Sequence, residues 1–350
     1  MNNWSMFLYR NRRAASIENP HLRVTVLEGG GHIAEIFDKQ TGVNPLWTPV
    51  WPSVEPSEFD PAKHTGYGTG ADNKLLAGIM GHNLCLDMFG GPSPDEAAAG
   101  LTAHGEASVA TYQFRQTAGE LIARAELPMA QLRVERTLTL VDRAVRIREV
   151  VESLASCDKP VGWTQHVTLG PPFLEKGITE FRASATRSKV FETVFGSADY
   201  LQLGAEFDWP MAPRTDGGEL DLRVFTGAPV SNAYTTHLMD QRGDAYFVAF
   251  SPASKLAFGY VWSASDFPWM GIWEENLSRP HAPWAGTSIT RGMEFGVSPM
   301  PEPRRKMIDR GKLFGVPTYR WIPARRQVAV EYWAVAQTAT SVPETLERPS

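Results

Sequence analysis

A strict two-residue alternation of apolar and polar side chains runs through the middle of the chain. From Leu132 to Leu140 the even positions are Leu, Val, Arg, Leu and Leu, and the odd positions between them are Arg, Glu, Thr and Thr. Successive side chains of an extended strand point to opposite faces, so this pattern predicts a half-buried β-strand. Residues 141–144 have the composition of a turn, and Val145-Arg146-Ile147-Arg148 resumes the alternation. Together these segments predict a β-hairpin.

Other segments are apolar on both faces and rich in aromatic and β-branched residues. Residues 245–250, 256–262 and 328–334 are of this kind, and residues 251–255 form a plausible hairpin loop between the first two. Such composition favours buried strands over helices. Helical signals are confined to single turns near residues 94–99 and 302–310. Short strands punctuated by 30 glycines and 26 prolines predict an all-β fold, a large antiparallel β-sandwich or barrel.

The chain shows no feature that divides it into parts. It contains no low-complexity linker and no repeat of fixed period. We therefore expect a single domain over residues 1–350, with residues 1–20 and 338–350 as peripheral tails.

Composition and charge argue against several classes of partner. Lys and Arg number 34 against 39 Asp and Glu, a net charge of −5, so no basic excess predicts nucleic-acid binding. No apolar run approaches the ~18 residues of a membrane span or forms a signal-peptide core. Two cysteines, Cys85 and Cys157, cannot build a disulfide framework. We expect a cytoplasmic protein with neither a nucleic-acid nor a membrane partner, and the oligomeric state stays open.

The common cofactor and metal motifs are absent from the sequence. It contains no Walker A motif, HExxH, CxxC, His-x-His or G-x-S-x-G, and the glycines of residues 66–70 lack the spacing of a dinucleotide-binding loop. We expect neither a metal ion nor an organic cofactor.

Two histidines stand among residues suited to a functional site. His104 follows a run of small residues and precedes Gly105-Glu106, whereas His166 alternates with Thr164 and Thr168. On a strand these three side chains share one polar face. The alternative for each histidine is a half-exposed ring that a backbone carbonyl satisfies.

A carboxylate is the third candidate. Glu294 lies between Met293 and Phe295, so on a strand it points away from both. On a cleft-lining face a desolvated carboxylate is a useful base, and on an exposed face Glu294 is a surface residue. Glu274 and Glu275 form a competing acidic site, of which only one side chain can enter a given cleft.

The order of these pieces resembles the aldose 1-epimerase (galactose mutarotase-like) superfamily over about Leu22 to Ala336. The alternating strand and Gly-rich turn of residues 24–36 resemble the family's opening. His104-Gly105 stands where the family has a His-Gly motif, and Gln165-His166 where a second histidine follows on a strand. Residues 268–273 and Gly292-Met293-Glu294 resemble the strands that end in the family's glutamate.

The resemblance implies a fold, an activity and roles for three residues. The fold is the large antiparallel sandwich of that family, and the activity is interconversion of sugar anomers without a cofactor. Glu294 would be the general base that takes the anomeric hydroxyl proton, and His166 the acid that protonates the ring oxygen. His104 would orient the sugar or stabilise charge. The chain is accordingly interpreted as an isomerase of carbohydrate metabolism whose partner is a small sugar.

The same resemblance suggests residues that bind the substrate. They are His82, Asn83, Gln165, Asp240, Trp273 and Glu274. The chain departs from the family at several of them: Gly81-His82-Asn83 stands where the family has an arginine, and the late aspartate could be Asp240 or Asp244. These departures indicate a divergent branch.

Two other functions stay open at this stage. One is a non-catalytic carbohydrate-binding sandwich, because the 11 tryptophans include Trp262, Trp269, Trp273 and Trp284, which could stack on sugar rings or simply pack in the core. The other is a glycoside hydrolase or lyase, for which Glu294 and Glu274 could supply the carboxylate pair.

Overall fold

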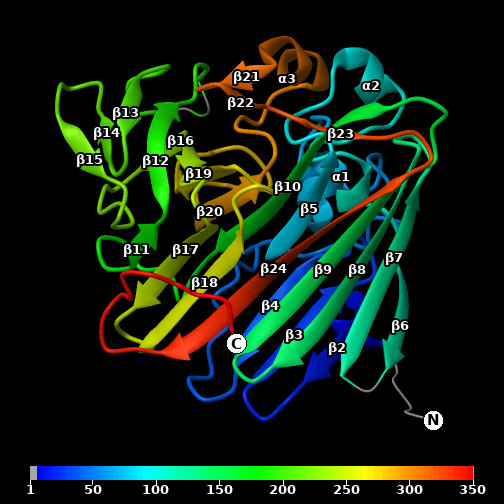
Figure 1. Ribbon diagram of the computed structural model, residues 1–350, viewed down its shortest axis with the longest axis horizontal. Coiled ribbons are helices and arrows are strands. Elements are labelled where there is room, and N and C mark those ends of the chain that lie inside the picture. The colour runs from blue at the N-terminus through cyan, green and yellow to red at the C-terminus, as the bar shows by residue number, and fades with distance from the viewer. Residues whose placement is uncertain (1–5, 118, 195, 197, 350) are drawn as a thin grey trace.

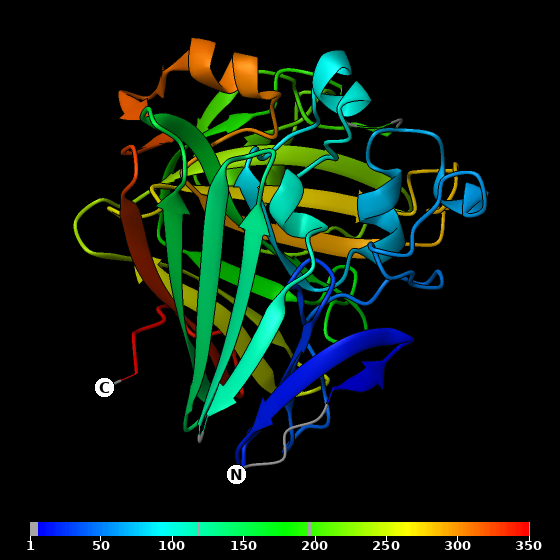
Figure 2. The same ribbon diagram turned by 90° about the vertical axis from the view of Figure 1, so that its right-hand side faces the viewer.

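Two large antiparallel β-sheets form the molecule. The computed structural model describes residues 6–117, 119–194, 196 and 198–349. In Figure 1 the smaller sheet lies in front of the larger one, and Figure 2 shows the two layers from the side. The all-β sandwich that the sequence predicts is confirmed.

The larger sheet has twelve strands within this described part of the chain. Its main path, from edge to edge, is β1 (Phe7–Tyr9), β2 (Arg12–Glu18), β3 (Leu22–Leu27), β4 (Ile33–Asp38), β5 (His82–Asp87), β10 (Lys159–Leu169), β20 (Ile289–Gly296), β19 (Trp269–Asn276), β16 (Ser231–Met239), β12 (Ala185–Val190) and β13 (Glu206–Asp208). The remaining strand, β23 (Arg320–Ile322), pairs with β10.

The smaller sheet has eight strands, likewise counted over the described residues. Their order is β11 (Glu180–Ala183), β17 (Asp244–Ser251), β18 (Leu256–Ser263), β24 (Gln327–Thr338), β9 (Ala144–Ser153), β8 (Leu132–Val141), β7 (Glu120–Leu127) and β6 (Gln113–Thr117). Two small ribbons pair β14 (Met211–Pro213) with β15 (Glu219–Asp221), and β21 (Lys312–Leu313) with β22 (Val316–Pro317).

Helices are short and lie in the connections. They are α1 (Asn73–Gly78), α2 (Pro94–Ala98), α3 (Arg304–Arg310) and the 3-10 turns Thr65–Tyr67 and Glu106–Ser108. The two single turns that the sequence predicts are thus α2 and α3. Within the described residues, no helix has the length and apolarity to cross a membrane.

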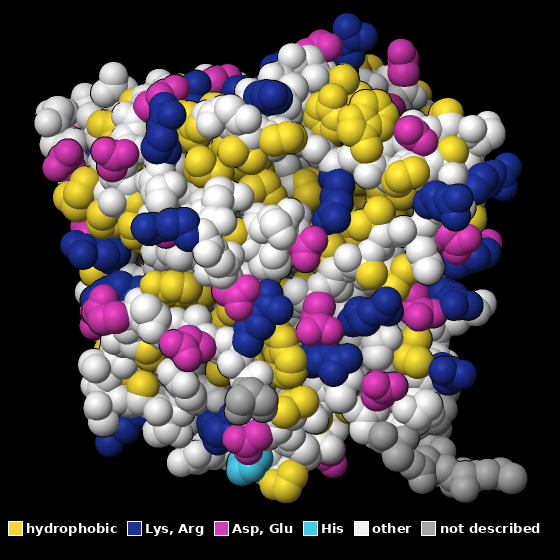
Figure 3. Space-filling model, in the orientation of Figure 1, with side chains coloured by type: hydrophobic (Ala, Val, Ile, Leu, Met, Phe, Trp, Pro, Cys, Tyr) yellow, Lys and Arg dark blue, Asp and Glu magenta, His cyan; other side chains and the backbone are white. Residues whose placement is uncertain are grey.

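The alternating segment forms the expected hairpin. β8 pairs with β9 in register from Leu132–Ser153 to Val141–Ala144, which confirms that prediction. The odd-numbered side chains of β8 face outward, where Arg133 pairs with Glu126 and Glu152. Figure 3 shows this outer face covered by interspersed basic and acidic side chains.

The main core lies between the sheets, and a second apolar cluster lies on the far side of the larger sheet. The first includes Trp163, Trp262 and Phe295, all fully buried. The second includes Trp273 and Trp284 and comes from β5, β16, β19 and the connections that cover that face. The strands of the larger sheet therefore form the bottom of any cavity that lies beneath these connections.

The described parts of the segments expected to be peripheral tails pack against the sheets. Most of residues 7–18 form β1, at the edge of the larger sheet, and β2 next to it, in which Arg12 is fully buried and pairs with Glu55 at 3.0 Å. At the other end, Val342 and Leu346 pack on β17 and β18. Residues 1–5 and 350 of those segments lie outside the described residues.

Candidate functional site

Four neighbouring strands of the larger sheet form the floor of the candidate site. β5, β10, β20 and β19 lie side by side, and their register aligns Asn83 with His166, His166 with Glu294, and Glu294 with Gly271. In antiparallel strands, directly paired residues project from the same face. The register therefore brings an amide, an imidazole and a carboxylate from three distant segments onto the outer face of the sheet.

His166 and Glu294 are in direct contact. Nε2 of His166 lies 2.9 Å from Oε1 of Glu294, and both side chains are almost completely buried. The other ring nitrogen, Nδ1, lies 3.0 Å from Oγ1 of Thr168, which fixes the orientation of the imidazole. As the strand alternation requires, Thr168 shares the face of His166. The pair thus places an imidazole nitrogen and a carboxylate oxygen side by side, shielded from bulk water.

The Glu294 carboxylate occupies space that glycine leaves open. A Cβ atom at Gly292, the preceding residue on the same face, would lie 2.3 Å from Oε1 of Glu294. Apart from its contact with His166, the buried Oε1 atom accepts no hydrogen bond from the described residues. The carboxylate therefore retains a lone pair for a hydroxyl donor that enters the site.

His104 reaches the same site from a loop. It has a positive φ of 66°, and the next residue, Gly105, has φ 75° and so close an approach to β5 that a Cβ there would lie 2.4 Å from the Leu86 carbonyl oxygen. Glycine is thus required in the His-Gly motif. The His104 ring centroid lies 4.6 Å from that of His166, and Nδ1 lies 3.2 Å from Oδ1 of Asn83.

The surroundings of His104 keep its ring neutral. Burial, followed by the neighbouring imidazoles of His166 and His32, holds the pKa of His104 well below its ordinary value. Asn83 is fully buried, and its Nδ2 atom has no hydrogen-bond partner among the described residues. Because Oδ1 of Asn83 is an acceptor, His104 donates from Nδ1 and leaves Nε2 as an acceptor.

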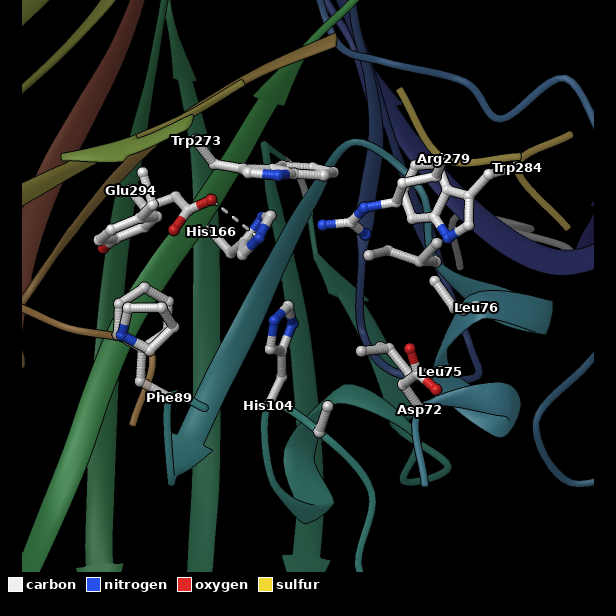
Figure 4. A pocket seen from close by; sticks show the side chains of 14 residues that line it. Asp72, Leu75, Leu76, Phe89, His104, His166, Trp273, Arg279, Trp284 and Glu294 are labelled. Atoms are coloured by element: carbon white, nitrogen blue, oxygen red, sulfur yellow. Dashed lines mark ion pairs between the residues drawn. The ribbon is translucent and has the colours of Figure 1, made fainter. Parts of the chain in front are cut away.

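Glu294, His166 and His104 line one cavity of about 110 Å³. Figure 4 shows Glu294, His166 and His104 on one side of it, with Asp72, Leu75, Leu76, Arg279 and Trp284 on the other. Trp273 extends along the cavity, with its ring centroid 5.8 Å from that of His166. A single water molecule occupies about 10–15 Å³ of such a cavity, so there is room for a small organic ring.

Arg279 is held in the cavity wall by the loop that follows β19. Glu275 accepts hydrogen bonds from the backbone N–H groups of Ser278 and Arg279, at 2.7 and 3.2 Å, and pairs with the Arg279 guanidinium at 3.2 Å. The guanidinium carbon lies 4.7 Å from the ring centroid of Trp284 and 5.4 Å from that of Trp273. Burial lowers the pKa of Arg279.

Of the substrate-binding residues suggested by the sequence, Trp273 lines the cavity and Asn83 contacts His104 beside it. His82 and Gln165 lie on the opposite face of their strands, inside the main core. Nε2 of His82 lies 2.9 Å from Oε1 of Gln165, which also accepts from the Tyr332 hydroxyl at 2.8 Å. Alternation puts neighbours on opposite faces, so neither side chain reaches the cavity.

Glu274 and the two aspartates also lie away from the cavity. Glu274 follows Trp273 on β19, so it points to the face of the sheet opposite the cavity, where it accepts hydrogen bonds from the hydroxyls of Ser231 and Tyr200. Asp240 is bound by Arg242 beyond the end of β16, and Asp244 pairs with Arg348 at the surface. Since Glu274 and Glu294 point to opposite faces, this pair cannot act across one glycosidic bond.

Several lining residues escape sequence reasoning. Arg279 and Asp72 come from irregular connections, and the two leucines come from the short helix α1; none of these segments has a residue pattern typical of a site. From the sequence, Trp284 is one of several tryptophans that could stack on a sugar ring. Of the others, Trp262 is buried between the sheets and Trp269 packs in the outer cluster. Within the described residues, no three His, Cys, Asp or Glu side chains gather as metal ligands.

Comparison with known proteins finds likeness in structure rather than sequence. No family model and no curated protein sequence matches this chain. A protein from Klebsiella pneumoniae assigned as a candidate aldose 1-epimerase superimposes with a TM-score of 0.65 and 15% identity, covering 94% of this chain and 80% of that one. A galactose mutarotase-like protein from Clostridium acetobutylicum has a TM-score of 0.62 and 12% identity, with coverage of 95% and 98%.

A galactose mutarotase related enzyme from Lactobacillus acidophilus gives a TM-score of 0.61 and 11% identity, with coverage of 94% and 99%. Identities this low establish architecture alone. The chain therefore has the galactose mutarotase-like sandwich fold, and its resemblance to the aldose 1-epimerase superfamily is confirmed at the level of the fold.

Proposed function

We propose that this protein is an aldose 1-epimerase-like enzyme that interconverts the anomers of a sugar. The observation that carries the proposal is the convergence of His166, Glu294 and His104 on one cavity. In a cyclic hemiacetal the anomeric hydroxyl oxygen and the ring oxygen are bonded to the same carbon. The acid and the base of ring opening must therefore lie close together, as His166 and Glu294 do.

The reaction conserves atoms and protons. Glu294 accepts the proton of the anomeric hydroxyl, the bond between the anomeric carbon and the ring oxygen breaks, and protonated His166 donates its Nε2 proton to that oxygen. Rotation about the bond from the anomeric carbon to its neighbour presents the other face of the aldehyde. The reverse transfers close the ring and return both residues to their starting states.

His104 and Trp273 position the sugar in this scheme. With Nδ1 engaged by Asn83, His104 offers Nε2 as an acceptor for a ring hydroxyl. The indole Nε1 of Trp273 is buried without a hydrogen-bond partner among the described residues, so it is a donor for a sugar oxygen. For Trp273, such a contact would satisfy a buried donor that lacks a partner among the described residues.

Saturation-transfer NMR of anomer exchange on a panel of aldoses tests the proposal. We expect exchange above the buffer rate for at least one sugar, and a loss of about 10²–10⁴-fold in Glu294→Gln and in His166→Asn. Glu331→Gln, at a half-buried position on the smaller sheet away from the cavity, is the matched control and should retain full activity. Wild-type rates equal to buffer on every sugar would overturn the enzymatic function.

A non-catalytic sugar-binding role is the second candidate. The observation that favours it is the aromatic wall of Trp273 and Trp284, whose ring centroids lie 5.8 Å apart in the cavity. Calorimetry separates the two functions. If Glu294→Gln binds sugar as wild type does and exchange is lost, the residue is catalytic. If wild type binds sugar without any exchange, the protein is a binding module.

A further inference from the structure

The wall of the cavity that faces the His166–Glu294 pair is largely apolar. Leu75, Leu76 and Ile79, from α1 and its C-terminal end, and Trp284 make up most of it, and Asp72 and Arg279 are its polar members. Figure 4 shows the two leucines projecting into the cavity opposite the reactive pair. A ligand whose anomeric carbon lies at Glu294 therefore meets aliphatic carbon on its far side.

The polar groups near this wall are already engaged. The guanidinium of Arg279 pairs with Glu275 and stacks on Trp284, and Asp72 and Asp199 add further negative charge near it. Its positive charge is thus balanced within the protein. Two carboxylates, Asp72 and Glu294, line the same cavity. The charge distribution disfavours a phosphorylated or carboxylated sugar.

A fully hydroxylated hexose does not fit this lining well. Each hydroxyl that is buried against leucine without a partner loses its hydrogen bonds to water. Replacing such a hydroxyl by hydrogen removes that penalty and adds apolar contact. From the apolar wall and the balanced charges we infer that the natural substrate is a neutral deoxy sugar, in which at least one carbon other than the anomeric one carries no hydroxyl. This inference rests on the proposed function, because it places the anomeric carbon at Glu294.

Matched sugars that differ by one hydroxyl test the inference. The probes are D-glucose with its 2-, 3-, 4- and 6-deoxy derivatives, D-galactose with D-fucose, and glucose 6-phosphate and glucuronate as the charged arms. Anomer exchange is measured by saturation-transfer NMR and binding by quenching of tryptophan fluorescence. We expect at least one deoxy sugar to exceed its parent by about 10–100-fold in kcat/KM and the charged sugars to be the poorest.

Variants of α1 link the preference to the wall. Leu76→Asn supplies a hydrogen-bonding partner and should lower the deoxy-to-parent ratio at least about fivefold. Leu75→Gln is the second variant, should Leu76→Asn melt below the assay temperature. Leu203→Asn, at an exposed position outside the cavity, is the control and should leave the ratio unchanged.

The results separate failure of this inference from failure of the proposed function. Exchange that is equal or faster on every parent sugar, or fastest on a charged sugar, overturns the inference and leaves the epimerase function intact. If the anomers of no sugar are exchanged, the proposed function is wrong, and binding measured by tryptophan fluorescence then tests the preference for a deoxy sugar. Tighter binding of a deoxy sugar than of its parent supports the inference, and equal or weaker binding overturns it.

Discussion

The carboxylate of Glu294 folds over Gly292, two residues earlier on the same face of β20. A Cβ at Gly292 would lie 2.3 Å from Oε1 of Glu294, which is closer than any nonbonded contact allows. The absence of a side chain at residue 292 thus sets where the proposed base sits. A substitution at Gly292 can therefore shift the carboxylate while residue 294 remains a glutamate.

The Gly292→Ala variant is expected to displace the carboxylate and lower kcat/KM for anomer exchange about 10–100-fold, because proton transfer depends steeply on position. Gly243→Ala is a matched control, since a Cβ there meets no atom within 4 Å. Saturation-transfer NMR gives the rates, and a thermal melt shows that the variant is folded. Wild-type activity in folded Gly292→Ala would contradict the proposed role of the glycine.

Glu275 and Glu274 are neighbours with opposite environments. Glu275 organises the loop that carries Arg279, whereas Glu274 bonds to Ser231 on the other face. We expect Glu275→Gln to raise KM about 3–10-fold with a smaller change in kcat, since it loosens the loop that holds Arg279 in the cavity wall and so weakens binding equally throughout the reaction. In Glu274→Gln, KM should stay unchanged even if the melting temperature falls. Equal KM values in the two variants would argue against a role for the Arg279 loop.

The buried ring of His237 predicts a loss of stability in acid. Burial lowers the pKa of His237 from 6.5 to about 3. Below pH 6.5 the unfolded chain binds a proton that the folded protein does not, so this contribution to stability is complete above pH 6.5 and is lost as the pH falls towards about 3.

Between these pH values, the contribution of His237 to the unfolding free energy falls by up to about 1.4 kcal/mol per pH unit. His237→Gln should therefore flatten the decrease of the unfolding free energy below pH 6.5 by up to that slope, measured by urea denaturation at several pH values. His281→Gln, at an exposed position, should keep the wild-type slope. A wild-type slope in both variants would show that His237 does not carry the effect.

A charge pair buried between the sheets predicts a large effect on stability. Oε1 of Glu149 lies 2.7 Å from the guanidinium of Arg136, and the same carboxylate accepts from Trp163 and Tyr332. Glu149→Ala leaves Arg136 charged and unpaired, which costs about 3–5 kcal/mol of unfolding free energy.

The control for that measurement is Glu331→Ala, which removes the partner of Arg146 in a partly exposed ion pair and should cost less than about 1 kcal/mol. The double variant Arg136→Met with Glu149→Leu should recover most of the stability, because no buried charge remains. Urea denaturation at neutral pH gives the unfolding free energies of the wild type and of the three variants. A double variant as unstable as Glu149→Ala would show that packing, and not charge, dominates.

The alternation of apolar and polar residues predicts much of the fold, because the geometry of an extended backbone points successive side chains to opposite faces. The hairpin of residues 132–148 and the loop of residues 251–255 are found where the sequence predicts them. Alternation also groups His166 with Thr168 on one face. It cannot say which face lines a cavity, since β10 is buried on both sides from Val161 to Leu169. For that reason Gln165 and His82 resemble site residues in sequence and lie in the core.

The sequence by itself determined the sandwich, the strands and a short set of polar residues at their centres, because these depend on local periodicity. Only the tertiary structure decided which of them meet. The register of β5, β10 and β20 brings Asn83, His166 and Glu294 together, and the loops carrying His104 and Arg279 close over them. Residues far apart in the sequence are thus brought together, because the outer face of the sheet must be covered to bury its apolar side chains.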